Sequence, residues 1–210
     1  MRKKFIAALT VVASMAFMAP AAAQETAVDE MPTLAEILLS DSAKDDENGF
    51  DARSWDYDIV TQAVLLFPDL VAAASNPDAE LTAFLPRDGA FRRLVYEISG
   101  QWVRSEADVF AAVAGLGVDT VKDVLLYHLV PAKISYRDAL GANGAEIPTL
   151  LGEETITVKV KNFWFWKFVK LVDNDTNDRN PIVVRPNLGG EASNGYAHGI
   201  NRVLRPIDLP

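Results

Sequence analysis

The sequence predicts an α+β fold in which helices come first along the chain and strands come later. Between residues 55 and 129, apolar side chains recur every three or four positions, which is the spacing of a helix that buries one face. From residue 147 onward, β-branched and aromatic runs are separated by glycine, asparagine and aspartate turns. Because helices followed by strands are typical of α+β proteins, we expect mostly antiparallel or mixed sheets.

The helical half is expected to contain five helices and one strand. The last two helices each open on a capping-box-like pattern, in which a hydroxyl residue is followed three positions later by an acid. Residues 80–86 form a brief apolar run that ends in proline, which favours a buried strand. The expected helices are residues 57–67, 69–75, 89–98, 105–117 and 120–129.

The second half is expected to be built from strands, because its apolar runs are short and rich in β-branched and aromatic residues. No internal repeat is found, so the pattern predicts one copy of one domain over residues 55–208. The expected strands are residues 147–160, 163–173, 181–186 and 196–207.

The N-terminus has the pattern of a secretory signal peptide. A basic head precedes an apolar run, and Ala21-Ala22-Ala23 is a small-residue site typical of bacterial proteins, so we expect cleavage after Ala23. The apolar run is shorter than the roughly 20 residues that a spanning helix needs, so we expect no membrane-spanning segment. Residues 24–54 are predicted to be an acidic linker, in which residues 33–40 can form a short, weakly docked helix.

Charge and cysteine content limit the classes of partner. The net charge of −9 becomes −12 after cleavage, because residues 1–23 carry three basic residues and no acid. Such an acidic surface repels phosphate backbones and anionic bilayers, so we expect no nucleic-acid partner. The chain has no cysteine, which excludes disulfides and thiolate chemistry in an exported protein and leaves stability to an ordinary hydrophobic core.

Three stretches, taken together and in this order, resemble the fasciclin domain family. They are LTAFLPRDGAFRRL (81–94), VLLYHLVP (124–131) and SNGYAHGINRVLRP (193–206). The resemblance implies a fasciclin-like wedge of two β-sheets with a cluster of helices packed on one side. It also implies a role in adhesion or recognition outside the cell, and enzymatic activity is not typical of the family.

His128 stands in an apolar run and needs a polar partner, because burying an unpaired polar group costs roughly 1–3 kcal/mol. The resemblance implies that this partner is Asp88, the acid of the first motif, so that Asp88 and His128 form a structural polar latch. Tyr127 is expected to point to the opposite side, where it is partly exposed and a candidate for recognition.

The sequence offers little support for a metal site or a catalytic centre. His128 and His198 are the only histidines, whereas zinc needs three or four ligands. The acidic segment at 173–180 departs from the calcium-loop pattern and is interpreted as a solvated hairpin loop. No nucleophile elbow or phosphate-binding loop is found. We therefore expect no cofactor, no metal and no enzymatic activity.

The aromatic stretch at 162–171 has two interpretations. Read as one strand, it places Trp164, Trp166 and Phe168 on one face and Phe163, Phe165 and Lys167 on the other. Either both faces are buried, or one remains exposed to a protein, a glycan ring or a membrane interface. The lysines at 159, 161, 167 and 170 favour an anionic partner. Trp164, Trp166 and Lys167 are therefore candidate recognition residues.

These observations lead to one expected function and one alternative. We expect an exported binding or adhesion module, periplasmic or extracellular, that recognises an envelope protein or polysaccharide as a monomer or weak homo-oligomer. The alternative is a periplasmic protein that binds a small molecule or lipid in a pocket between the wedge and the helices.

Overall fold

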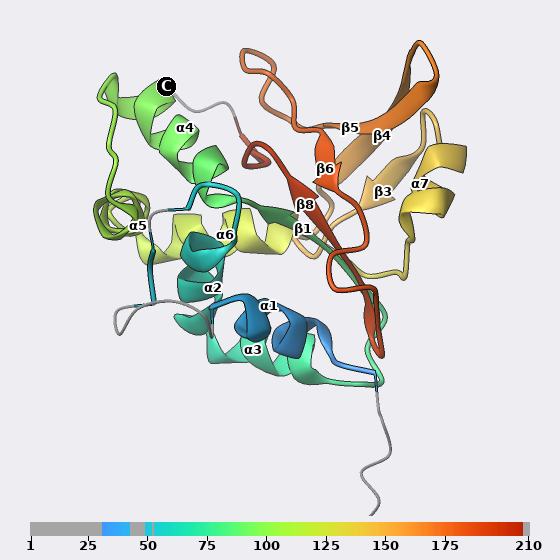
Figure 1. Ribbon diagram of the computed structural model, residues 1–210, viewed down its shortest axis with the longest axis horizontal. Coiled ribbons are helices and arrows are strands. Elements are labelled where there is room, and N and C mark those ends of the chain that lie inside the picture. Colours follow the sequence, from blue (N-terminus) through green and yellow to red (C-terminus); the bar gives the residue numbers. More distant parts are fainter. Residues whose placement is uncertain (1–30, 43–48, 52, 208–210) are drawn as a thin grey trace, which may run out of the picture.

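A computed structural model describes residues 31–42, 49–51 and 53–207 of the chain. Within these residues, seven helices and eight strands form a layered α+β fold (Figure 1). The expected signal peptide and the beginning of the expected linker lie outside the described residues. The helices are α1 (Leu34–Ser42), α2 (Asp58–Leu65), α3 (Pro68–Ser75), α4 (Asp88–Ser99), α5 (Glu106–Ala114), α6 (Val118–Tyr127) and α7 (Tyr136–Gly141).

The first sheet is mixed and lies at the centre of the fold. Its strand order is β2-β1-β8-β6, and β7 also pairs with β8. β1 runs parallel to β8 and antiparallel to β2, so the last strand of the fold lies beside the first. The strands are β1 (Leu81–Pro86), β2 (Leu129–Val130), β6 (Val183–Arg185), β7 (Glu191–Ala192) and β8 (Gly195–Ile200).

Two glycines of β8 let this sheet form. Gly195 has φ +152°, and a Cβ there would lie 1.7 Å from the carbonyl oxygen of Leu81. A Cβ at Gly199 would lie 2.0 Å from the hydroxyl oxygen of Tyr57. A side chain at either position would collide with a neighbour in the sheet or with the helical layer, so both positions require glycine.

The second sheet is antiparallel and has the order β3-β4-β5. β3 is Glu146–Pro148, β4 is Thr155–Phe163 and β5 is Trp166–Val172. The β4–β5 hairpin extends away from the helices, and α7 packs beside the same sheet (Figure 1). The aromatic stretch predicted as one strand over 162–171 is therefore wrong in its geometry, because the chain turns back at Trp164 and Phe165.

β1 is buried along its whole length because it is covered on both faces. Leu81, Ala83 and Leu85 face a core shared with α1 to α6, whereas Phe84 faces a second core shared with β4, β5 and α7. The alternation of side chains along a strand separates the two cores. This arrangement confirms the predicted α+β class and explains why residues 80–86 are uniformly apolar.

α1 differs from the weakly docked helix that the sequence suggested. Leu34, Ile37 and Leu38 are buried in the first core, and the N–H of Leu34 donates to the side chain of Asn194 at 2.9 Å. Part of the expected linker is thus packed onto the domain. Among the described residues, no single helix is long and apolar enough to cross a membrane. Within the same part of the chain, α2 and α3 reach the length and apolar composition of a membrane span only when they are taken together, and the pair is bent by 109°.

Candidate functional site

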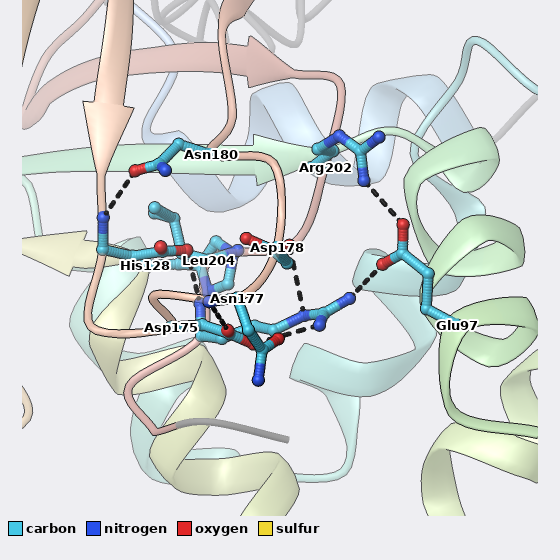
Figure 2. Close-up of polar contacts among 10 residues, drawn as sticks. Glu97, His128, Asp175, Asn177, Asp178, Asn180, Arg202 and Leu204 are labelled. Carbon is cyan, nitrogen blue, oxygen red and sulfur yellow. Dashed lines mark hydrogen bonds and ion pairs between the residues drawn. The ribbon is translucent and has the colours of Figure 1, made fainter. Parts of the chain in front are cut away.

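His128 is buried and links the end of α6 to the C-terminal segment, residues 201–205, through hydrogen bonds. Its ring is 4 % exposed, and Nδ1 lies 2.6 Å from the carbonyl oxygen of Val124. Nε2 accepts a hydrogen bond of 2.9 Å from the N–H of Leu204 (Figure 2). These contacts require a neutral ring with its proton on Nδ1. Burial lowers the pKa of His128 to about 4, which keeps it neutral at physiological pH.

Asp88 fastens a different pair of elements. Its side chain accepts a hydrogen bond of 3.0 Å from the N–H of Ile59, in the first turn of α2. Its own N–H donates to the carbonyl oxygen of Asp56 at 3.0 Å. Asp88 therefore joins the start of α4 to the start of α2, where it satisfies one of the free N–H groups of that helix.

The predicted Asp88–His128 pair does not form. Both residues are buried and structural, but each has another partner, because the backbone supplies the groups that each side chain needs. The expectation for Tyr127 is also wrong. Its side chain is fully buried, and its hydroxyl donates to the carbonyl oxygen of Thr155 at 2.9 Å. Burial raises the pKa of Tyr127. A fully covered tyrosine cannot contact a partner at the surface.

Several carboxyl groups gather between α2, α4 and α5. Two sets have oxygens within 4.8 Å of one another, namely Asp56 with Asp58 and Asp88, and Asp51 with Asp58 and Glu106. Such groupings have the geometry to hold a divalent cation. A proton shared between Asp56 and Asp88 also relieves the repulsion among these carboxyl groups. Burial, and then the hydrogen bond with Asp56, raise the pKa of Asp88 to about 10, which favours its protonated form.

Arg205 is the centre of a second polar network. Its Nη1 lies 3.0 Å from Asp175, its Nη2 pairs with Glu97, and its backbone N–H donates to Asp173 at 3.0 Å (Figure 2). Arg202 pairs with the other oxygen of Glu97 at 2.7 Å. The network ties the loop at 173–180 and α4 to the C-terminal segment.

The loop at 173–180 is therefore not the solvated hairpin loop that the sequence suggested. Asp173 and Asp175 are buried, and Asp178 lies 3.6 Å from Nε of Arg205. Burial raises the pKa of Asp173 to about 7, and the N–H of Arg205 opposes that shift. This acidic loop can be buried because Arg205, distant in the sequence, forms ion pairs with Asp175 and Asp178. The arginines of NRVLRP are the only feature of the sequence that could have indicated a partner for this loop. Which acids they pair with is set by the tertiary structure.

The tip of the β4–β5 hairpin is the most exposed aromatic surface in the described part of the chain. Trp164, Phe165 and Trp166 are 85 %, 90 % and 75 % exposed. The rings of Trp164 and Phe165 meet edge to face, with centroids 6.1 Å apart. Trp164 has φ +54°, a conformation that is uncommon for a bulky residue. Of the two sequence interpretations, the exposed one describes these side chains.

Lysines are the only charged residues of the β4–β5 hairpin strands and turn. Residues 155–172 contain four lysines and no acid. Lys159 lies directly opposite Lys170 in the hairpin register, and Lys161 lies opposite Phe168. Lys159, Lys161 and Lys170 share the outward face, since Val158, Val169 and Leu171 fill the core face. Lys167 is exposed on the other face. The hairpin thus combines apolar rings with positive charge.

Comparison with known proteins agrees with the architecture. The family profile of the fasciclin domain matches residues 58–206. Among solved structures, the chain is similar to a FAS1 domain pair from the insect cell adhesion molecule fasciclin I, with a TM-score of 0.55 and 17 % identity. The match covers 84 % of this chain and 51 % of that one, so the chain spans about half of its length. The comparison with curated proteins gave no match.

Proposed function

The chain belongs to the fasciclin domain family, and from this premise we propose that it is an exported, non-enzymatic adhesion module that binds through its β4–β5 hairpin tip. The family supports a binding or adhesion role in general. Export is supported by the signal-peptide pattern of residues 1–23, with cleavage after Ala23 and a periplasmic or extracellular destination. The proposed partner is an envelope protein or polysaccharide.

The observation that carries this proposal is the exposure of three consecutive aromatic side chains at 164–166. Large apolar groups at a surface mark interaction sites, because their removal from water is favourable when a partner covers them. Trp164 also adopts its unfavourable φ at the turn, where asparagine or glycine is the usual choice. Tryptophan at this position costs conformational energy and gains no burial in the fold. A binding role explains best why it stands there.

The lysines indicate that the partner carries negative charge. Lys159 and Lys170 are directly opposite each other, and like charges at such a pair destabilise a hairpin. An acidic group on the partner would relieve that repulsion. At physiological salt, charges more than about 8 Å apart are largely screened. The hairpin can therefore attract an anionic surface although the whole chain is acidic.

The alternative function, binding of a small molecule or lipid, requires a pocket between the wedge and the helices. The two apolar cavities beside His128 have volumes of about 30 and 40 Å³. Sites for small-molecule ligands typically hold roughly 300–1,000 Å³. Each of these two cavities has room for only one or a few waters, so neither can hold a ligand of that size. His128 also has both ring nitrogens bonded to backbone groups, as suits a structural residue.

A pulldown from envelope extracts tests the proposal. The full chain is compared with the double variant Trp164→Ser and Trp166→Ser, and with a control in which Trp55 and Trp102 are replaced by serine. These control tryptophans are also exposed, at 62 % and 57 %, but lie elsewhere on the surface. We expect the tip variant to lose the captured partner and the control to retain it.

Equal capture by the tip variant and the wild type would refute the role of the tip. Equal loss in both variants would indicate nonspecific adhesion of exposed tryptophan. A glycan array run with the same three proteins separates a polysaccharide from a protein partner. If the partner is a polysaccharide, the wild type and the control should bind glycans on the array and the tip variant should not.

A further inference from the structure

A cleft lined by charged and polar side chains opens at the polar network around Arg205. It has a volume of about 640 Å³. It is formed by α4, the loop at 173–180 and the C-terminal segment at 201–205. Its wall consists of four arginines, namely Arg93, Arg179, Arg202 and Arg205, together with Glu97, Asp178 and Asn177. None of these residues has an apolar side chain.

The base of the cleft is rigid before any ligand arrives. Glu97 lies between the guanidinium groups of Arg202 and Arg205 and pairs with both (Figure 2). Asp175 and Asp178 hold Arg205 from the interior. Arg202 is 9 % exposed and makes its ion pair through Nη1. Arg202 and Arg205 are therefore committed to the carboxylates of the protein, and the guanidinium groups left for a ligand are those at the rim.

The rim of the cleft carries free positive charge. Arg93 and Arg179 are exposed, and neither forms an ion pair with any residue that the structure describes. Arg202 and Arg205 are engaged by the carboxylates of the network, whereas Arg93 and Arg179 carry charge that no described ion pair neutralises. Two such guanidinium groups at the rim of a concave site attract an anion.

We propose that this cleft binds the uronate groups of an acidic saccharide. A planar guanidinium matches a carboxylate in two parallel hydrogen bonds, which is the role assigned to Arg93 and Arg179. Glu97 is 29 % exposed in the middle of the wall and can accept hydrogen bonds from hydroxyl groups. Exposed Asn177 can both donate and accept. A uronate carries a carboxylate and hydroxyls together, so it complements both parts of the wall.

The same wall discriminates against ligands that offer only anionic acceptors. A sulfate or a run of acidic peptide side chains would bring negative charge against Glu97 with no hydroxyl to satisfy it. The site lies on residues other than the aromatic tip, so this inference is independent of the proposed function. It adds a second, carbohydrate-specific contact to the module.

The test measures binding of an oligogalacturonate to the full chain by calorimetry at low ionic strength. Three ligands are compared: the oligomer, its methyl ester, which lacks the charge, and a polyaspartate with the same number of carboxylates. The protein variants are the double replacement Arg93→Glu and Arg179→Glu, and the control Arg104→Glu, an exposed arginine outside the cleft.

We expect the wild type to bind the oligogalacturonate and the double variant to lose at least tenfold in affinity. Arg104→Glu should change it less than twofold, and the methyl ester and polyaspartate should bind at least tenfold more weakly. Absence of wild-type binding, an Arg104→Glu effect equal to that of the cleft variant, or tighter binding of polyaspartate would each overturn the inference. The variant Trp164→Ser and Trp166→Ser should bind the oligomer normally, which separates this result from the test of the tip.

Discussion

The polar interior around Arg205 and the aromatic tip of the β4–β5 hairpin reverse the usual placement of residue types. In the interior, Asp175 is 1 % exposed and Arg205 is 4 % exposed, and each is held by an ion pair. At the tip, Trp164 and Phe165 are almost fully exposed, and their rings meet edge to face. Charged groups are thus buried in one region while large apolar groups face water in the other.

The difference teaches which region serves the fold and which is available to a partner. A buried ion pair is costly to break, because the remaining charge has neither water nor a counterion. An exposed aromatic ring contributes little to folding, because it stays in water in both states. Substitutions in the interior should therefore affect stability, and substitutions at the tip should affect binding. The predictions below run from the largest expected effect on stability to the smallest.

The largest effect is expected for Asp175→Ala. This change leaves the buried guanidinium of Arg205 with an incomplete set of partners and should lower the free energy of unfolding by about 3–5 kcal/mol. Urea denaturation at pH 7 measures it. The matched control is Asp69→Ala, which breaks an exposed pair with Lys122 and should leave the urea midpoint unchanged. A similar midpoint for both variants would contradict the contrast between buried and exposed charge.

His128→Ala should cost about 2–4 kcal/mol, because it leaves a cavity and an unsatisfied N–H at Leu204. A double-mutant cycle with Asp88→Asn tests the corrected partners. Since His128 and Asp88 fasten different elements, the two effects should add within about 0.5 kcal/mol. A coupling energy well above that value would restore the direct pair that the sequence suggested.

The pH dependence of stability should be governed by the raised pKa values. Folded Asp88 keeps a proton that the unfolded chain releases above its ordinary pKa of 3.8. The free energy of unfolding therefore falls as pH rises toward about 10. Glu106 acts in the same direction, since burial raises its pKa to about 7. His128 opposes them only on acidification, between pH 6.5 and about 4.

Asp88→Asn should flatten this slope between pH 7 and 9 and stabilise the protein there, because an amide keeps the acceptor for Ile59 without a carboxyl proton to lose. Urea midpoints at pH 5, 7 and 9 measure the slope. An unchanged slope in the variant would show that Asp88 is ionised in the folded protein.

The smallest effect on stability is expected for Trp164→Ser with Trp166→Ser. Because both rings are exposed, the pair of changes should alter the free energy of unfolding by less than about 1 kcal/mol. Thermal and urea unfolding measure it alongside the pulldown. A loss above 2 kcal/mol would mean that the tip belongs to the core and would weaken its assignment as a binding surface.

Much of the fold was predictable because local pattern and tertiary structure agree. The helix over 105–117 starts where its capping pattern predicts, and the side chain of Ser105 accepts from the N–H of Asp108 at 3.3 Å. The buried strand over 80–86 is β1. The helix that was missed is α7, which has only six residues although Ser135 and Asp138 form a capping box at its start. α1 was expected as a short helix, but its firm docking depends on Leu34, Ile37 and Leu38 reaching the core.

The candidate sites were predicted less well, because partners and exposure depend on distant segments. The aromatic and lysine residues of 159–170 were found from composition, but the turn at Trp164 violates ordinary turn preferences and was read as a continuous strand. The cleft was missed, since Arg93, Arg179 and Arg202 come from three separate segments.

By itself, the sequence determined the α+β class, the positions of most helices and strands, and the need to bury His128. Only the tertiary structure decided that His128 binds the backbone of Leu204, that Arg205 neutralises a buried acidic loop, and that the tryptophans at 164 and 166 face water. The physical reason is range. Helix and strand patterns follow from neighbours a few positions apart, whereas each hydrogen-bond partner is chosen by segments that meet only when the sheets and helices pack.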